Sequence, residues 1–330
     1  MNNYIPPFEI TNSMLQKVAS IMEKIGNLDN YNYLDKNPYL RKQKRISSVH
    51  SSLAIENNKL SLNEVKDVIN GKIVIGDKKE IQEVKNAYKA YDMLKEINQY
   101  STKDLKKVHG VMTFLTVEQS GKFRTGAEGV FDGDTCIFVC PPADMVPSLM
   151  NNLFNWMKQN KDTIHPLILS CIFHYEFVFI HPFSDGNGRM ARLWQNVILY
   201  NWKNIFEYIP IESKIHKYQD DYYKAIANSN NNGNSNEFID FMLKMIDDAL
   251  LDAISNSPVA LTNEDININK LLDIMEENKP ITASEIMQRL GIKSKETLRK
   301  MYLDPAIKKE LIHLTIPDKP TSKNQMYYKI

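Results

Sequence analysis

The densest apolar stretch of the chain is HPLILSCIFHYEFVFI, residues 165–180. It is shorter than the roughly 20 residues that a membrane-spanning helix needs, and it carries His174 and Glu176 in its interior. We therefore predict a buried helix in the core of a globular protein, and no association with a membrane. We interpret His174 as a core histidine whose hydrogen bonds are satisfied.

Helical periodicity continues through most of the sequence. One stretch differs, because residues 120–142 combine glycines with β-favouring residues on both sides of Asp132-Gly133-Asp134, which predicts a short β-hairpin at 130–139. The expected fold class is mainly α, with this hairpin as a flap. We expect helices over residues 14–28, 40–56, 61–71, 79–98, 102–115, 146–158, 166–180, 187–202, 219–227 and 237–253.

The composition limits the classes of function and location. A length of 330 residues suggests about two domains. The net charge of +1 provides no general attraction to nucleic acid or to anionic membranes. Three cysteines, an odd number, argue against a disulfide framework, and the first residues lack the features of a signal peptide, so we expect a cytoplasmic protein.

The segment HPFSDGNGR, residues 181–189, follows the buried run directly. Gly186, Asn187 and Gly188 form a turn at the start of the next helix, where unpaired N–H groups and the helix dipole favour an anion. Arg189 and Arg192 are three residues apart on that helix and share a face, so both can bind one multiply charged ligand. The pattern predicts a site for a phosphate chain.

Two further side chains of the segment supply chemistry. Asp185 is a hard oxygen ligand, and Mg²⁺ commonly takes one carboxylate together with phosphate oxygens. His181 is the group of this segment that titrates near neutral pH, which suits a general base. The alternative is an ordinary helix cap beside a buried histidine, which the combination of all these residues disfavours.

HPFSDGNGRMAR resembles the signature HPFx[D/E]GNGRxxR of the Fic family, the protein adenylyltransferases. The likeness extends over about residues 5–250, since the hairpin resembles the family's flap and the N-terminal region resembles a helical module found ahead of the Fic core. The resemblance implies that His181 deprotonates a target hydroxyl, which attacks the α-phosphorus of the substrate ATP. It also implies that Asp185 holds Mg²⁺, that residues 186–188 bind phosphate, and that Arg189 and Arg192 bind the β/γ end. Phe183 would anchor the loop in the core.

A carboxylate occupies an unexpected position in the segment RISSVHSSLAIENN. Ile46, Val49 and Leu53 form an apolar stripe at helical spacing, and the next position on it is Glu56, with Ser52 one turn earlier. A carboxylate on a core-facing stripe needs a partner. The alternative is a solvated residue at the end of a helix.

The stretch Ser52-Leu-Ala-Ile-Glu56-Asn57 matches the family's inhibitory motif (S/T)xxxE(G/N). The resemblance implies that Glu56 pairs with Arg192, so that ATP binds unproductively until the pair is released. In some relatives the equivalent glutamate positions a water molecule that removes AMP again.

Weaker similarities place Tyr223 and Asn230 at the adenine, although tyrosines at helical spacing also occur as core residues. Relatives that transfer phosphate or phosphocholine exist, but the intact Asp185 and both arginines favour AMP. The sequence does not name the target protein or the hydroxyl, Ser, Thr or Tyr, and leaves homodimer formation open.

The C-terminal segment has a different character. Helix, Gly291 turn, helix and strand-like pair suggest a winged helix-turn-helix, and residues 281–330 hold ten lysines and arginines against five acidic residues. DNA, protein and dimer contacts are all consistent with it, so a DNA-binding regulator with a nucleotide-sensing Fic core is the alternative function. The expected domains are an N-terminal helical module (1–100), a Fic core (101–254), a linker (255–269) and a winged-helix-like domain (270–330).

Overall fold

The computed structural model describes residues 5–29, 38–132, 135–255, 263–276, 279–309, 311–320 and 322–329. The chain divides into two compact units, residues 1–255 and residues 256–330. Each unit has its own hydrophobic core. In the described part of the chain, every helix is too short or too polar to cross a membrane.

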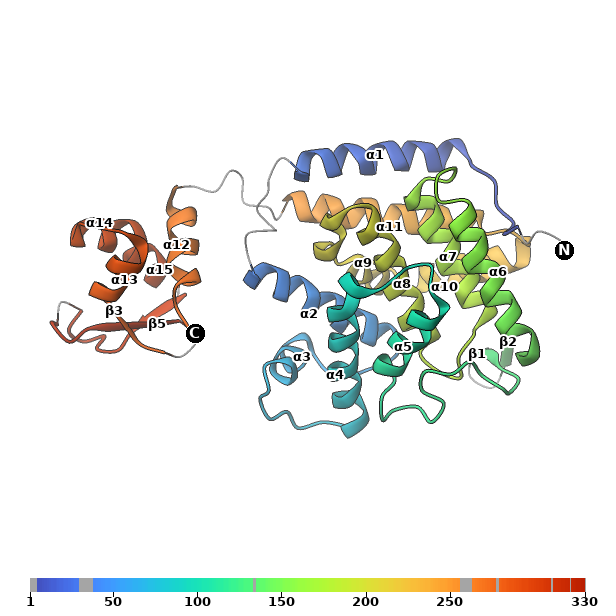
Figure 1. Ribbon diagram of the computed structural model, residues 1–330, viewed down its shortest axis with the longest axis horizontal. Coiled ribbons are helices and arrows are strands. Elements are labelled where there is room, and N and C mark those ends of the chain that lie inside the picture. Colours follow the sequence, from blue (N-terminus) through green and yellow to red (C-terminus); the bar gives the residue numbers. More distant parts are fainter. Residues whose placement is uncertain are drawn as a thin grey trace. The chain divides into compact units, whose positions relative to one another are not determined.

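The first unit is helical, as its periodicity predicts (Figure 1). The apolar run forms α7, whose residues are buried along nearly its whole length, and α7 packs most extensively against α8. Helices α1 and α11 pack against each other, although they lie at opposite ends of the unit's sequence. The helices are α1 (Asn12–Asp29), α2 (Pro38–Ile55), α3 (Leu62–Ile69), α4 (Lys78–Asp92), α5 (Thr102–Met112), α6 (Val146–Gln159), α7 (Pro166–Ile180), α8 (Asn187–Trp202), α9 (Ile211–Lys217), α10 (Gln219–Asn232) and α11 (Asn236–Ser255).

The expected hairpin is present as β1 (Gly129–Asp132) and β2 (Thr135–Val139). The strands are antiparallel, with Gly129 opposite Val139, and the register shifts between Val130 and Phe131. The turn predicted at residues 133 and 134 lies outside the described residues. The resemblance to the family's flap therefore rests on the strand pairing.

The described residues of the second unit form four α-helices and a three-stranded antiparallel sheet in the order β3-β5-β4. Gly291 ends α13 in the left-handed conformation, at the turn that the sequence predicted. Thr282 caps α13 in a reciprocal box with Glu285, and Ser294 caps α14. The order of helix, turn, helix and strand pair is thus confirmed, while its assignment to the winged-helix class stays a prediction. The elements are α12 (Asn263–Asp273), β3 (Ile281–Thr282), α13 (Ala283–Leu290), α14 (Lys295–Leu298), α15 (Asp304–Lys308), β4 (Ile312–Leu314) and β5 (Met326–Lys329).

Three boundaries differ from the expectations. The predicted linker 255–269 overlaps α12, because Ile268 and Leu271 are buried in the core of the second unit. Helix α10 continues to Asn232, beyond the predicted end at residue 227, and Gly233 ends it in the left-handed conformation. The proposed boundary at residue 100 does not separate two compact units, because residues on both sides share one core. Helix α9 had no counterpart among the predicted helices.

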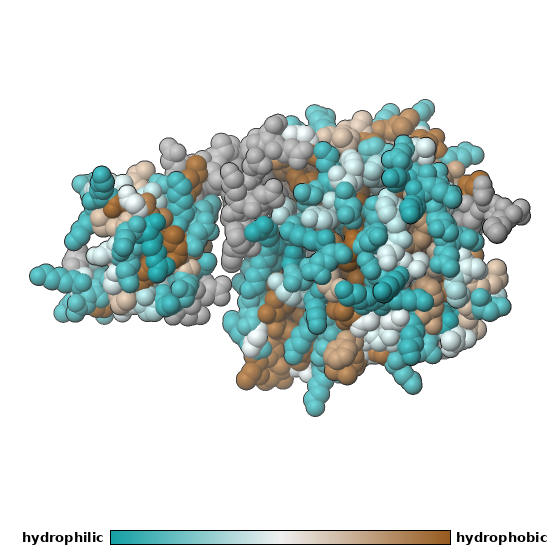
Figure 2. All heavy atoms as spheres, viewed as in Figure 1, coloured by the Kyte–Doolittle hydropathy of each residue, from teal (hydrophilic) through white to brown (hydrophobic). Residues whose placement is uncertain are grey.

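Hydrophilic residues cover most of the surface seen in Figure 2, with apolar residues between them. Some apolar side chains are strongly exposed, including Ile73 and Ile75 in the connection between α3 and α4. Isolated exposed apolar residues are common in folded proteins, so they do not by themselves identify a site.

Candidate active site

The site begins where α7 ends. His181 has a left-handed backbone conformation with φ of 51°, which turns the chain out of the buried helix. The guanidinium of Arg124 is 2% exposed and donates to the carbonyl oxygens of Ile180, His181, Gly126 and Pro141. Arg124 therefore supplies the hydrogen-bond donors that the end of a buried helix requires, and it joins that end to the two chain segments that flank the hairpin.

The ring of His181 is held in one tautomer. Its Nδ1 lies 3.2 Å from the carbonyl oxygen of Val178, which can only accept, so Nδ1 carries the proton and Nε2 presents a lone pair. Burial lowers the pKa of His181, and the Arg124 charge lowers it further. At neutral pH the imidazole is thus uncharged and able to accept a proton through Nε2.

The turn after His181 is fixed by Asn187. The Asn187 side chain accepts from the N–H of Phe183 at 2.9 Å and donates to the Phe183 carbonyl at 2.7 Å. Phe183 itself is fully buried, in agreement with the expected anchoring role. Gly186 precedes α8 with φ of 81°, where a Cβ would come within 3.0 Å of Thr113. The first N–H groups of α8 therefore have no acceptor within the helix, and its N-terminus attracts anions.

His109 supports this turn from α5. Its Nδ1 accepts from the Gly121 N–H at 2.9 Å, so Nε2 carries the proton and donates to the carbonyl of Asp185 at 3.0 Å. The ring stacks on Phe183 with 3.6 Å between centroids and is fully buried. Burial lowers the pKa of His109 to about 4, so the ring is neutral at physiological pH.

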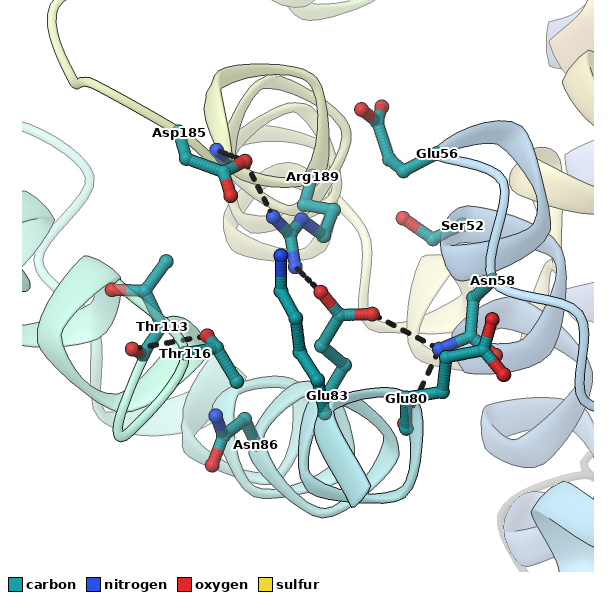
Figure 3. Close-up of polar contacts among 12 residues, drawn as sticks. Ser52, Glu56, Asn58, Glu80, Glu83, Asn86, Thr113, Thr116, Asp185 and Arg189 are labelled. Carbon is teal, nitrogen blue, oxygen red and sulfur yellow. Dashed lines mark hydrogen bonds and ion pairs between the residues drawn. The ribbon is translucent and has the colours of Figure 1, made fainter. Parts of the chain in front are cut away.

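Arg189 lies between two carboxylates (Figure 3). Its Nη2 is 2.7 Å from Oδ1 of Asp185, and its Nη1 is 3.3 Å from Oε1 of Glu83 on α4. The side chain of Asp185 is 41% exposed, beside an anion-attracting helix end, which fits a single carboxylate that shares Mg²⁺ with a phosphate chain. Among the described residues, no group of three or more ligating side chains could hold a metal alone.

Arg192 is buried and faces α2. Its Nη2 is 2.7 Å from Oε1 of Glu56, its Nε donates to the Ser52 hydroxyl at 3.0 Å, and Nη2 also donates to the Ser52 carbonyl at 2.9 Å. Burial disfavours the charged guanidinium, but the Glu56 carboxylate together with Tyr222 and Tyr91 outweighs this effect and raises the pKa of Arg192. The expected ion pair between Glu56 and Arg192 is therefore present.

Gly188 lies in the first turn of α8, directly against this ion pair. A Cβ at position 188 would be 2.3 Å from Oε1 of Glu56 and 3.2 Å from Nη1 of Arg192. Only glycine permits this approach, so the Glu56 carboxylate occupies the space over the helix N-terminus. Glu56 directly follows Ile55, the last residue of α2. Its side chain is 32% exposed, so it projects into this site and not into the core.

Tyr223 and Asn230 both belong to α10, two turns apart. The Tyr223 hydroxyl donates to the carbonyl of Ile55 at 3.2 Å, at the end of α2, and its side chain is half exposed. The Asn230 amide oxygen accepts from the Tyr175 hydroxyl at 2.8 Å. The structure thus places Tyr223 near Glu56, and a role of either residue in adenine binding stays a prediction.

Sequence reasoning missed the residues that support the site. Arg124, His109 and Glu83 come from three segments before α7, and each contacts the 181–192 segment through a long-range bond. Glu83 had one local signal, since it stands next to the apolar Val84, whereas the lysines of α4 are exposed. Arg124 and His109 had none, because their burial depends on tertiary packing.

Comparison with known protein families and proteins identifies relatives of the chain. Residues 92–199 match the Fic/DOC family, and residues 266–329 match the C-terminal domain of the Fic-like "filamentation induced by cAMP" proteins. A protein adenylyltransferase Fic of Nematostella vectensis is 27% identical over 214 residues, which are 62% of this chain and 47% of the relative. A probable protein adenylyltransferase of Aquifex aeolicus is 32% identical over 166 residues, 49% of this chain and 48% of the relative. The chain thus spans less than half the length of these curated relatives.

A solved structure resembles the whole chain. The crystal structure of a Fic family protein from Desulfovibrio desulfuricans is 39% identical, with a TM-score of 0.76, and the similarity covers 99% of this chain and 98% of that one. The structure of Fic-1 (residues 134–508) from Caenorhabditis elegans has a TM-score of 0.59 at 23% identity, covering 73% and 72% of the two chains, which shows a shared fold.

Proposed function

Because the chain belongs to the Fic family, we propose that it is an adenylyltransferase that moves AMP from ATP to a protein hydroxyl and that Glu56 inhibits it. One observation carries the proposal: the Glu56 carboxylate binds Arg192 and fills the space over Gly188 at the N-terminus of α8. This is the position that suits the terminal phosphates of ATP. Curated relatives named protein adenylyltransferases support the activity in general.

The residues of the site supply the groups for the transfer. Nε2 of His181 takes the proton of the target's Ser, Thr or Tyr hydroxyl, whose oxygen then attacks the α-phosphorus of ATP. A bond forms between that oxygen and phosphorus, the bond from the α-phosphorus to the bridging oxygen breaks, and pyrophosphate leaves. Such a reaction depends mainly on positioning and on neutralising charge, which Arg189, Arg192 and the N–H groups of residues 187–189 provide.

Asp185 is the residue that would hold Mg²⁺. When bound with ATP, the ion would neutralise charge on the phosphates. Asp185 is oriented for this by the His109 bond to its backbone carbonyl and by the contact with Arg189. Arg189 keeps Glu83 as a partner when Asp185 turns towards another ligand.

The Glu56 contact favours an inhibited resting state. A carboxylate in this position satisfies Arg192 and the positive end of α8, so a phosphate must displace it to bind there. Tyr223 contacts the same end of α2, which places a proposed adenine contact beside the inhibitor. In the wild-type protein the same glutamate would position a water molecule for removal of AMP, so addition of wild-type protein to labelled protein should release the label.

The test is labelling by the Glu56→Gly protein. With ATP and Mg²⁺, label from the α-phosphate is expected on protein and label from the γ-phosphate is not, and mass spectrometry should find added AMP on a Ser, Thr or Tyr. The Glu56→Gly/His181→Ala protein should remain unlabelled. Absence of α-label in every variant, with ATP bound, would contradict the proposal.

The alternative of a DNA-binding regulator is less favoured by the second unit. Arg299 and Lys300 form ion pairs with Asp304 and Glu296, so acidic residues of the second unit neutralise part of the unit's positive charge. A DNA mobility-shift titration of the full chain at two salt concentrations separates the two functions. Salt-sensitive binding together with no AMP transfer would favour the regulator.

A further inference from the structure

A single carboxylate on α4 connects the two halves of the site. Glu83 accepts from Nη1 of Arg189 through Oε1, at 3.3 Å, and from the Asn58 amide through Oε2, at 3.0 Å (Figure 3). Its side chain is 13% exposed and that of Arg189 is 3% exposed, so water screens this contact weakly. Glu83 thus touches both the phosphate-binding helix and the segment that follows the inhibitory glutamate.

Asn58 fixes the turn that presents Glu56. Its N–H donates to the Leu53 carbonyl at 3.1 Å, which closes the end of α2 around Asn57 in the left-handed conformation. Its amide also donates to the carbonyl of Glu80 at 3.2 Å, on α4. Asn58 is 8% exposed, and it therefore ties the end of the inhibitory helix to α4.

Arg189 depends on its neighbours for its orientation. Nη1 binds Glu83, Nη2 binds Asp185, and its buried Nε has no hydrogen-bond partner in the described part of the chain. A guanidinium with a buried, unsatisfied donor tends to reorient when one of its anchors is lost. Glu83 is the more buried of the two anchors, since Asp185 is 41% exposed and would turn towards a metal.

We propose that Glu83 is a positioning residue with two effects: through Oε1 it orients Arg189 towards the nucleotide, and through Oε2 it keeps Asn58, and with it Glu56, in the inhibitory position. This inference rests on the proposed function, since it concerns regulation of that same site. Glu83 acts through its partners and does not touch the substrate. A glutamine at position 83 has one acceptor oxygen and one donor group, so it cannot satisfy both donors at once.

Two variants separate the two effects. Asn58→Ala removes only the tie to the inhibitory turn, whereas Glu83→Gln also disturbs Arg189. Glu80→Gln is the matched control one turn earlier on α4, because its side chain accepts from the Lys59 N–H and leaves the Glu80 carbonyl unchanged. Glu83→Asp is a second test, since it keeps the charge but is one methylene too short to reach both partners.

The measurements use the full chain and α,β-methylene-ATP, which cannot release pyrophosphate. In the Glu56→Gly background, Glu83→Gln and Glu83→Asp should weaken its binding about tenfold, the scale of one charge-assisted hydrogen bond, while Asn58→Ala leaves it unchanged. With ATP in this background, KM should rise and kcat should stay the same for Glu83→Gln. With Glu56 present, hydrogen exchange of residues 56–60 should accelerate in Asn58→Ala and Glu83→Gln, whereas any change in Glu80→Gln should be confined to the Lys59 amide, which donates to the Glu80 side chain.

The outcomes are distinguishable from those of the proposed function. Absence of AMP transfer in all variants would reject the adenylyltransferase, while the binding and hydrogen-exchange data would still decide the role of Glu83. Unchanged nucleotide affinity in Glu56→Gly/Glu83→Gln and in Glu56→Gly/Glu83→Asp, or unchanged exchange at residues 56–60 in Glu83→Gln, would overturn the inference.

Discussion

Removal of the Glu56 side chain is the most informative perturbation of this protein. The Glu56–Arg192 contact is a charge-assisted bond of 2.7 Å between a fully buried guanidinium and a carboxylate that is 32% exposed. Such a bond contributes about 2 kcal/mol, more than an exposed ion pair, because water reaches only one partner. If the proposed function holds, ATP must overcome the same free energy to engage Arg192.

Two kcal/mol corresponds to a factor of roughly 30 in an equilibrium. We therefore expect Glu56→Ala and Glu56→Gly to increase AMP transfer about 30-fold at subsaturating ATP, measured by α-labelled ATP. Glu56→Gln should give an intermediate increase, because a neutral amide still donates or accepts but lacks the charge. The Ala variant controls for the added backbone freedom that Gly introduces at a helix end.

A second measurement checks the same physical argument without catalysis. Loss of Glu56 leaves a buried cation without its partner, so the free energy of unfolding of the first unit should fall by about 1–3 kcal/mol. ATP should restore it, since the phosphates replace the carboxylate. If wild type, Glu56→Ala and Glu56→Gly label equally and melt at the same temperature, the ion pair has no inhibitory or stabilising effect and the reasoning is wrong.

Three further predictions concern single residues. Transfer by the Glu56→Gly protein should rise with pH through a midpoint below 6.5 and be flat from pH 7 to 8, because burial lowers the pKa of His181 and the neutral ring is the base; a midpoint above 6.5 would contradict this. Gly188→Ala in the Glu56→Gly background should weaken ATP binding about tenfold by calorimetry, because its Cβ takes the place now occupied by the Glu56 carboxylate, and unchanged affinity would exclude that position for phosphate. The free energy of unfolding of the wild type should fall by up to about 3 kcal/mol through His109 alone as pH falls from 6.5 to 4, because the unfolded state binds a proton that the folded state, with a pKa of about 4, resists. In urea titrations, the free energy of unfolding of His109→Gln should decline less steeply with pH, and an identical dependence on pH would refute the assignment.

The sequence alone was sufficient for much of the fold and for the contact between Glu56 and Arg192. Helices α7 and α8 agree with their predicted bounds, because a long apolar run and a helical repeat of apolar residues are local signals. The pairing of Glu56 with Arg192 was expected from motif resemblance, since each motif is contiguous in the chain. The last turn of α10, residues 228–232, was missed, because tertiary contacts such as the Asn230 bond to Tyr175 stabilise it.

What the sequence determined was therefore a set of chemical groups in short contiguous segments: an imidazole, an anion-attracting turn, two arginines and the carboxylate of Glu56. What only the tertiary structure decided was how these groups are held. The Arg124 bonds to four carbonyls, the His109 contact with Asp185 and the bridge from Arg189 through Glu83 to Asn58 join segments far apart in the chain. A buried polar group must find its partner wherever packing brings one within hydrogen-bond distance, and that distance is a property of the folded chain and not of sequence separation.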